Sequence, residues 1–129
     1  MNERPELGTP TWQVTVEVPE RTEKPWGHEE LLIRGTYALK RLYVRAGQRL
    51  SLQFHEHKVE TLVVASGEAE ILLDGVLGHY RPGDVLHVPA GAVHRIGAGA
   101  SDVELIEAST PELEDVVRVE DDYGRSDRP

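Results

Sequence analysis

The stretch SLQFHEHKVE, which begins at Ser51, concentrates side chains that bind divalent metal ions. Gln53, His55 and His57 are spaced two residues apart, so on a β-strand all three would point to one face. Glu60 adds a carboxylate three residues later. Because the chain contains no cysteine, its metal ligands would be imidazole, carboxylate or amide groups. The pattern predicts a metal centre, and the shared face alone leaves His57 in competition with Gln53.

The segments that must position these residues have the pattern of short β-strands. Residues 12–18 alternate, with Trp12, Val14, Val16 and Val18 on one face. Short apolar or alternating runs follow, namely HEELLIR, YALKRLYV, LSLQFH, TLVVAS, EAEILL, DVLHVP and DVELIEA, and turns rich in Gly and Pro separate them. Only PELEDVVRV has a helical period. This organisation predicts an all-β sandwich or barrel.

One domain accounts for the length of the chain. The sequence has 129 residues, enough for one ordinary hydrophobic core, and no second domain, repeat or low-complexity linker is evident. We expect the domain to span residues 11–125, with flexible ends at residues 1–10 and 126–129.

The charge and the hydropathy pattern narrow the classes of partner. A formal net charge of −9 opposes binding to nucleic acid or to an anionic membrane. The N-terminus is polar, and no apolar run approaches the ~20 residues that a membrane span needs. We therefore expect a soluble cytoplasmic protein, without a nucleic-acid or membrane partner. Residues 34–58 are locally basic and leave room for a small anionic ligand.

The segment that carries the polar residues also has an apolar face, formed by Leu50, Leu52 and Phe54. If the polar face lines a barrel, this apolar face must be covered from outside, either by the N-terminal strand or by a second subunit. A homodimer is the expected arrangement.

Two spaced motifs resemble those of the cupin superfamily, whose members are double-stranded β-helix (jelly-roll) barrels. The first motif, at residues 47–67, is Gly, five residues, His, one, His, four, Glu, six, Gly, and Gln53 takes the first histidine's place. The second, at residues 83–98, is Gly, five residues, Pro, one, Gly, two, His, three, Asn. Gly83, Pro89, Gly91 and His94 match it, and Ala98 replaces the Asn.

The resemblance implies a metal held by Gln53, His55, Glu60 and His94. These intervals favour Gln53 over His57, which would stand too far from the first glycine and too close to the glutamate. Imidazole, carboxylate and amide ligands suit Zn²⁺ first and also allow Mn, Fe or Ni. A metal-free barrel with hydrogen-bonded interior polar groups is the alternative.

Further segments resemble one cupin family in particular, the C-terminal isomerase domain of type II mannose-6-phosphate isomerases. They are KPWGHEE, LKRLYVRAGQRLSLQFHEHKVET, VVASGEAEI, VPAGAVHRI and EDVVRVEDDYGR, and together they cover nearly all the chain after about Thr22. Many members also carry a mannose-1-phosphate guanylyltransferase portion. These 129 residues lack its Gly-rich nucleotide-binding sequence, so we do not expect nucleotide transfer.

The resemblance implies isomerisation of mannose 6-phosphate to fructose 6-phosphate, or of a related sugar, through an enediolate. Lys40 and Arg49 match family positions, and with Glu107 they are the candidate catalytic residues. A Lys40 facing the cavity near the cation would have a lowered pKa and could carry the proton. Arg118 and Arg125 are candidates to bind the phosphate group. They could equally pair with the acidic side chains of Glu114, Asp121 and Asp122.

Two other classes of function use the same barrel. A cupin dioxygenase or another metal enzyme would hold iron or nickel in this cage, although oxygen-activating cupins more often supply three histidines. A binding module would recognise a sugar or an effector without turnover. Lys58, where the family commonly has Arg, and Thr61 depart from the family pattern beside a predicted ligand.

Overall fold

The computed structural model describes residues 18–127, and within them every regular element is a β-strand. The strands are β1 (Glu20–Lys24), β2 (Gly27–Arg34), β3 (Ala38–Val44), β4 (Leu52–Phe54), β5 (Glu60–Ser66), β6 (Ala69–Leu73), β7 (Val76–Tyr80), β8 (Val85–Val88), β9 (His94–Ala98), β10 (Val103–Ser109) and β11 (Val117–Glu120). The all-β expectation is confirmed. No helix in residues 18–127 has the length and apolar character of a membrane span.

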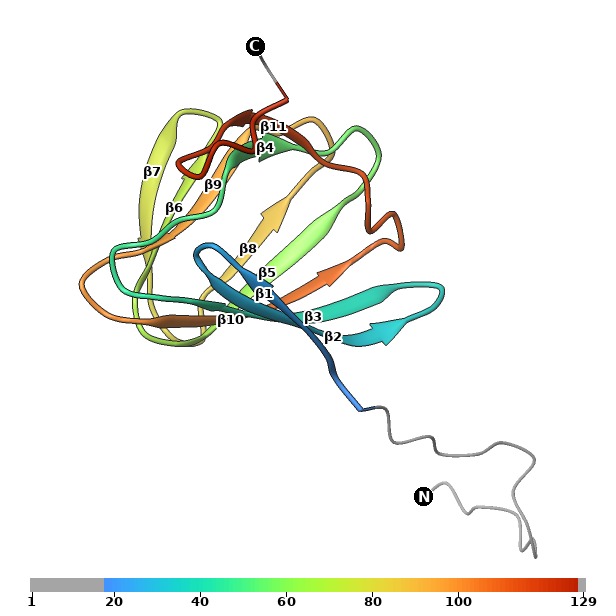
Figure 1. Cartoon of the computed structure of the whole chain (residues 1–129), viewed down its shortest axis with the longest axis horizontal. Coiled ribbons are helices and arrows are strands. Elements are labelled where there is room, and N and C mark those ends of the chain that lie inside the picture. The colour runs from blue at the N-terminus through green and yellow to red at the C-terminus, as the bar shows by residue number, and fades with distance from the viewer. Residues whose placement is uncertain (1–17, 128–129) are drawn as a thin grey trace, which may run out of the picture.

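Two antiparallel sheets enclose the core (Figure 1). One has the strand order β1-β2-β3-β10-β5-β8, and the other has the order β11-β4-β9-β6-β7. The buried apolar side chains come from both sheets and from the loops between them. The connected cluster consists of Trp26, Leu42, Val44, Leu50, Leu62, Val64, Ala69, Ile71, Val88, Ala92, Ile96, Ala98, Val103 and Leu105, and Ala38 is buried apart from it. Two sheets that share one core in this order form the jelly-roll barrel that the resemblance to cupins implies.

The alternation of side chains along β5 and β10 places two carboxylates inside the barrel. On β10, Leu105 and Glu107 are buried, and on β5, Glu60 and Leu62 are buried. The two strands pair antiparallel, with Glu107 opposite Leu62. Since successive side chains on a strand point to opposite faces, the register that buries the leucines also turns the glutamates inward.

Gly67, which ends the first motif, is required by a close backbone contact. Its φ is +75°, and a Cβ atom at this position would lie 2.1 Å from the carbonyl oxygen of Asp102. Any other residue would therefore clash with the loop before β10. The glycine spacing of the motif follows from this turn at the end of β5.

Several local expectations differ from the structure. The one helix-like segment, PELEDVVRV, forms turns and then strand β11, which pairs with β4. Strands β1, β7, β9 and β11 were not expected, because they are short and lack a clear alternation. Leu50 was expected to need a cover from outside the barrel, but it is buried in the core. The chain before β4 is irregular, so strict alternation of side chains fails there.

The expectations for the two ends of the chain can be followed only in part. Residues 1–10 and the alternating segment from Trp12 lie outside the described residues, except Val18, which is exposed. At the other end, Asp127 accepts a hydrogen bond from the Arg118 backbone N–H at 2.8 Å, and its own N–H donates to the Arg118 carbonyl at 2.9 Å.

Candidate metal centre

Three buried side chains from separate parts of the chain converge inside the barrel. His55 follows β4 directly, Glu60 begins β5 and His94 begins β9. One ligand atom from each lies within 4.8 Å of the others. Glu60 Oε1 is 3.0 Å from His94 Nε2 and 3.4 Å from His55 Nε2. This His-Glu-His cluster can hold a metal ion.

Backbone carbonyls orient both imidazole rings of the cluster. His55 Nδ1 donates to the carbonyl oxygen of Asp115 at 2.6 Å, and His94 Nδ1 donates to the carbonyl of Ala92 at 2.9 Å. Because a carbonyl only accepts, both Nδ1 atoms carry hydrogen. The Nε2 lone pair of each neutral ring then faces Glu60, which is the arrangement that second-shell carbonyls impose on metal-binding histidines.

The polar atoms that face one another in this cluster lack ordinary partners. Within residues 18–127, His55 Nε2, His94 Nε2 and both carboxylate oxygens of Glu60 are buried without a hydrogen bond of acceptable geometry. Two lone pairs directed at a carboxylate repel it unless a cation lies between them. The donor set and its burial therefore fit a divalent metal ion.

The charge on Glu60 is stabilised by its surroundings. Burial by itself would raise the pKa of this carboxyl. When no metal is bound, a proton on Nε2 of His55 or His94 can bond to Glu60, and together with the Lys58 charge this outweighs burial and holds the pKa well below its ordinary value. Glu60 is consequently ionised at neutral pH, as a metal ligand must be.

Gln53 and His57 occupy different environments, although both are near His55 in sequence. Gln53 lines the cavity and pairs with His94 across β4 and β9, while its amide oxygen accepts a hydrogen bond from Ser51 at 2.6 Å. His57 is exposed in the loop after β4. The strand alternation that would have made the three side chains equivalent ends at Phe54.

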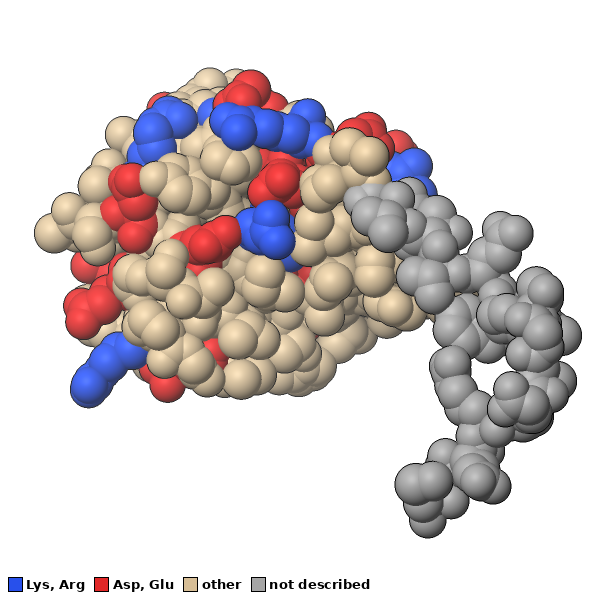
Figure 2. Space-filling view, turned by 90° about the horizontal axis from the view of Figure 1, so that it is seen from below, with Lys and Arg blue, Asp and Glu red and all other residues tan. Residues whose placement is uncertain are grey.

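The cavity beside the cluster is notably basic. It is lined by Lys24, Trp26, Glu29, Lys40, Leu42, Leu50, Ser51, Gln53, His55, Lys58, Glu107, Leu113, Val116, Arg118 and Arg125. On the face shown in Figure 2, basic and acidic side chains are intermixed. Five of the fifteen lining residues are Lys or Arg, in a chain with a formal net charge of −9. This local excess suits an anionic ligand.

Lys40 lines the cavity as part of a network of charges. Its Nζ lies 2.7 Å from one oxygen of Glu29, and Lys24 Nζ lies 3.1 Å from the other oxygen. Burial would lower the pKa of Lys40, but the carboxylates of Glu107 and Glu29 outweigh burial and raise it. The expectation of a lowered pKa is not met, because carboxylates surround this ammonium group.

Glu107 and Lys58 are charged residues beside the cluster. Lys58 Nζ lies 3.5 Å from Glu60 Oε2 and 4.0 Å from Glu107 Oε1, and both side chains are buried. Burial, with the negative charge of Glu60, raises the pKa of Glu107 to about 7. The cavity wall therefore holds a carboxyl group that can exchange a proton near neutral pH.

The remaining candidate residues divide between the cavity and its outside. Arg118 and Arg125 line the cavity, and Arg125 also forms an ion pair with Asp121 at 2.9 Å. Arg49 does not line it. Its guanidinium group pairs with Asp122 at 2.6 Å, and half of its side chain is exposed. The structure thus brings together all the predicted site residues except Arg49 and His57.

Sequence reasoning did not single out two residues that shape the centre. Lys58 was noted only as a departure from the family pattern, and its burial follows from the way the loop turns into β5. Asp115 accepts hydrogen bonds from the backbone N–H groups of residues 56, 57 and 58, at 2.7–2.9 Å. No local signal could have revealed this contact, because the partners are 57–59 residues apart.

Comparison with solved structures places the fold among the cupins. A cupin-2 domain from Rhodospirillum rubrum superposes with a TM-score of 0.67 at 14% identity, covering 81% of this chain and 78% of that one. The protein therefore has a cupin fold, and its buried His-Glu-His cluster can hold a metal ion. The family model described as mannose-6-phosphate isomerase C-terminal matches residues 13–121, and the chain belongs to this family.

Curated relatives agree with this assignment. The chain is 36% identical over 107 residues to mannose-1-phosphate guanylyltransferase of Escherichia coli, covering 79% of this chain. It is 32% identical over 111 residues to alginate biosynthesis protein AlgA of Pseudomonas aeruginosa, covering 82% of this chain. The chain spans 22% and 23% of the length of these two relatives.

Proposed function

We propose that the protein is a metal-dependent aldose–ketose isomerase that converts mannose 6-phosphate to fructose 6-phosphate, or acts on a related sugar phosphate. The observation that carries this proposal is the buried cluster of His55, Glu60 and His94 at the wall of a cavity rich in Lys and Arg. Membership of the mannose-6-phosphate isomerase C-terminal family supports the choice of substrate.

His55, Glu60 and His94 would hold the metal ion, with Gln53 as the fourth ligand, and zinc is the first choice ahead of manganese, iron or nickel. A divalent ion at this position supplies positive charge that stabilises a developing enediolate. The chain itself must supply the group that moves the proton.

Glu107 is the proposed proton carrier. In the forward reaction it takes the proton from C2 of the open-chain aldose and returns it to C1, while the hydroxyl proton on O2 moves to O1. The atoms then balance without an external oxidant. Lys58, 4.0 Å away, keeps positive charge beside this carboxyl. Lys40, paired with Glu29, stabilises charge and does not carry the proton.

Arg118 and Arg125 are proposed to bind the phosphate group. Both line the cavity, and the guanidinium of Arg118 has no ion pair among residues 18–127. A guanidinium group with free N–H donors matches the geometry of phosphate oxygens.

Isotope exchange tests the proposal directly. The purified protein, with its metal determined by elemental analysis, is incubated with mannose 6-phosphate in deuterated water and followed by NMR. We expect ketose formation and deuterium at C2 of recovered aldose. Glu107→Gln should slow exchange at least ~100-fold, the usual contribution of a general base. Glu114→Gln, an exposed carboxylate nearby in sequence, should leave the rate unchanged. If the metal-loaded protein produced neither deuterium exchange nor ketose, that result would contradict isomerase activity.

A further inference from the structure

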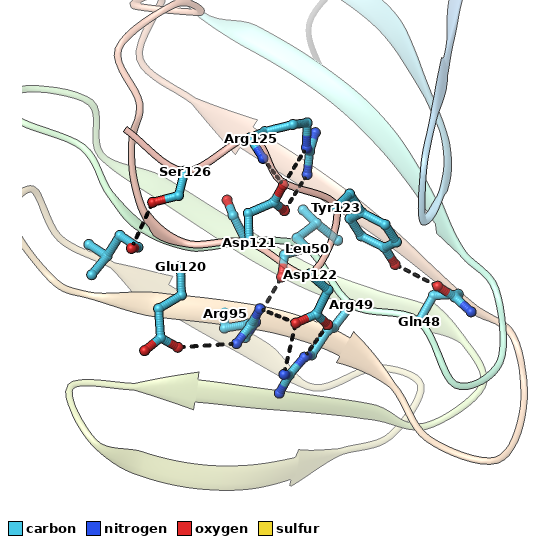
Figure 3. Close-up of polar contacts among 12 residues, drawn as sticks. Gln48, Arg49, Leu50, Arg95, Glu120, Asp121, Asp122, Tyr123, Arg125 and Ser126 are labelled. Carbon is cyan, nitrogen blue, oxygen red and sulfur yellow. Dashed lines mark hydrogen bonds and ion pairs between the residues drawn. The ribbon is translucent and has the colours of Figure 1, made fainter. Parts of the chain in front are cut away.

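Asp122, just after β11, accepts hydrogen bonds from Arg49 and Arg95 (Figure 3). Its Oδ2 accepts from Arg49 Nε at 2.6 Å, and its Oδ1 accepts from Arg49 Nη2 at 3.0 Å. The same Oδ1 accepts from Arg95 Nη2 at 3.2 Å. A carboxylate held by two parallel bonds from one guanidinium group has a defined orientation as well as a defined place.

Arg95 is a rigid partner, since its own position is set by other contacts. It is 7% exposed on β9, and its Nε donates to the carbonyl oxygen of Leu50 at 2.8 Å. Its Nη1 lies 3.8 Å from Glu120 at the end of β11. We call Arg49, Arg95 and Asp122 the C-terminal latch. It ties the last part of the chain to the sheet that carries Gln53 and His94.

The segment that the latch holds carries both proposed phosphate-binding residues. Arg118 stands four residues before Asp122 and pairs with Gln53 across β11 and β4. Arg125 stands three residues after Asp122, where Asp121 accepts hydrogen bonds from its Nε and Nη2, each at 2.9 Å. Only three residue pairs join β11 to β4, with a register shift among them. Strand pairing alone is therefore a weak anchor for these two arginines.

Arg49 is poorly placed to touch a substrate. Its guanidinium group is engaged with Asp122, 52% of its side chain is exposed, and it does not line the cavity. We infer that Arg49 is a positioning residue: together with Arg95 and Asp122 it holds residues 117–125 so that Arg118 and Arg125 face the cavity. The inference rests on the proposed function for the nature of the ligand, an anionic sugar phosphate.

A double-mutant cycle, in which ligand affinity is measured for each variant, tests the role of the C-terminal latch. The affinity of the metal-loaded protein for mannose 6-phosphate is measured by calorimetry for the wild type, Arg49→Gln, Asp122→Asn and the double variant. We expect each single variant to weaken binding about tenfold. The double variant should bind about as weakly as Asp122→Asn alone, because the loss of that carboxylate already removes the contact that Arg49 makes. In an Arg118→Gln background, Arg49→Gln should add little. Metal content and kcat should stay within about twofold, so that the loss falls on KM.

Arg41→Gln is the matched control, because Arg41 also pairs with carboxylates, Glu30 and Glu104, but does not line the cavity. It should bind the sugar phosphate like the wild type. Arg49→Lys, which keeps the charge but loses the bidentate geometry, should fall between the wild type and Arg49→Gln. If Arg49→Gln or Asp122→Asn does not fold, this milder variant still tests the inference.

Three outcomes would overturn the inference: unchanged affinity in Arg49→Gln, additive losses in the double variant, or a fall in kcat at constant affinity. The last would return Arg49 to direct contact with the reacting atoms. Absence of binding by the wild type would also overturn it. Binding without turnover would refute the isomerase proposal alone, since the mutant cycle is read from affinity.

Discussion

Gln53 is the residue on which the composition of the metal centre depends. It lines the cavity opposite His94, whereas His57, two positions beyond His55, is exposed. A cavity-facing amide can swing its oxygen from Ser51 to a metal ion, because both contacts use the same lone pairs. An exposed imidazole at position 57 cannot reach the cluster without moving the loop.

Substitution of the two side chains should separate their roles. We expect Gln53→Ala to lower zinc affinity about tenfold or more, and His57→Ala to retain nearly all of it. Titration of the metal-free protein with zinc, in competition with a chelating dye, measures both constants. The opposite ranking would place His57 in the coordination sphere and remove Gln53.

The resemblance of the two spaced motifs to the cupins implied that His55, Glu60 and His94 share one site. The structure brings these three side chains together. The burial of Lys58 beside the cluster was not predicted from the sequence. A lysine is rarely buried, and only the carboxylates of Glu60 and Glu107 make its burial tolerable.

At the scale of elements, Asp115 joins the loop before β5 to the segment before β11. Its carboxylate accepts three backbone N–H groups of residues 56–58, and its carbonyl accepts from His55 Nδ1. Burial would raise the pKa of Asp115, but these hydrogen bonds outweigh burial and lower it from 3.8 to about 2. The charged form is therefore the one that stabilises this junction.

The lowered pKa of Asp115 predicts an acid-sensitive contribution to stability. Because the folded-state pKa lies below the unfolded value, the contribution is complete above about pH 4 and is lost as the pH falls through about 2. Asp115→Asn should reduce the free energy of unfolding by about 1.5–3 kcal/mol at pH 7, the value of a hydrogen bond to a charged group. Urea unfolding followed by circular dichroism at pH 7 and pH 2.5 should show a smaller difference from the wild type at the lower pH. Glu114→Gln is the control, and a gap independent of pH would contradict the assignment.

At the scale of the whole molecule, we propose that the protein is a homodimer. Apolar side chains stay exposed on the strands at the edges of the two sheets: Val76 and Leu77 on β7 are 71% and 56% exposed, and Val85 on β8 is 62% exposed. A symmetric contact between two subunits would remove these apolar side chains from water, and this burial would favour the dimer. Light scattering at micromolar concentration should give twice the mass of one chain, and Val85→Asp should reduce the dimer fraction. A monomer at that concentration would refute the proposal.

Alternation and turn residues were enough to predict an all-β barrel, because these patterns act over a few residues. The set of His55, Glu60 and His94 was implied by the resemblance of two spaced motifs to the cupins. Tertiary structure decided the rest. Arg49 pairs with Asp122, which is 73 residues away in the sequence, and therefore does not line the cavity. His55 bonds to the carbonyl of Asp115, which is 60 residues away. Such contacts depend on how β11 closes onto β4. The free energy that selects this closure comes from packing and ion pairs between distant segments, which no local pattern records.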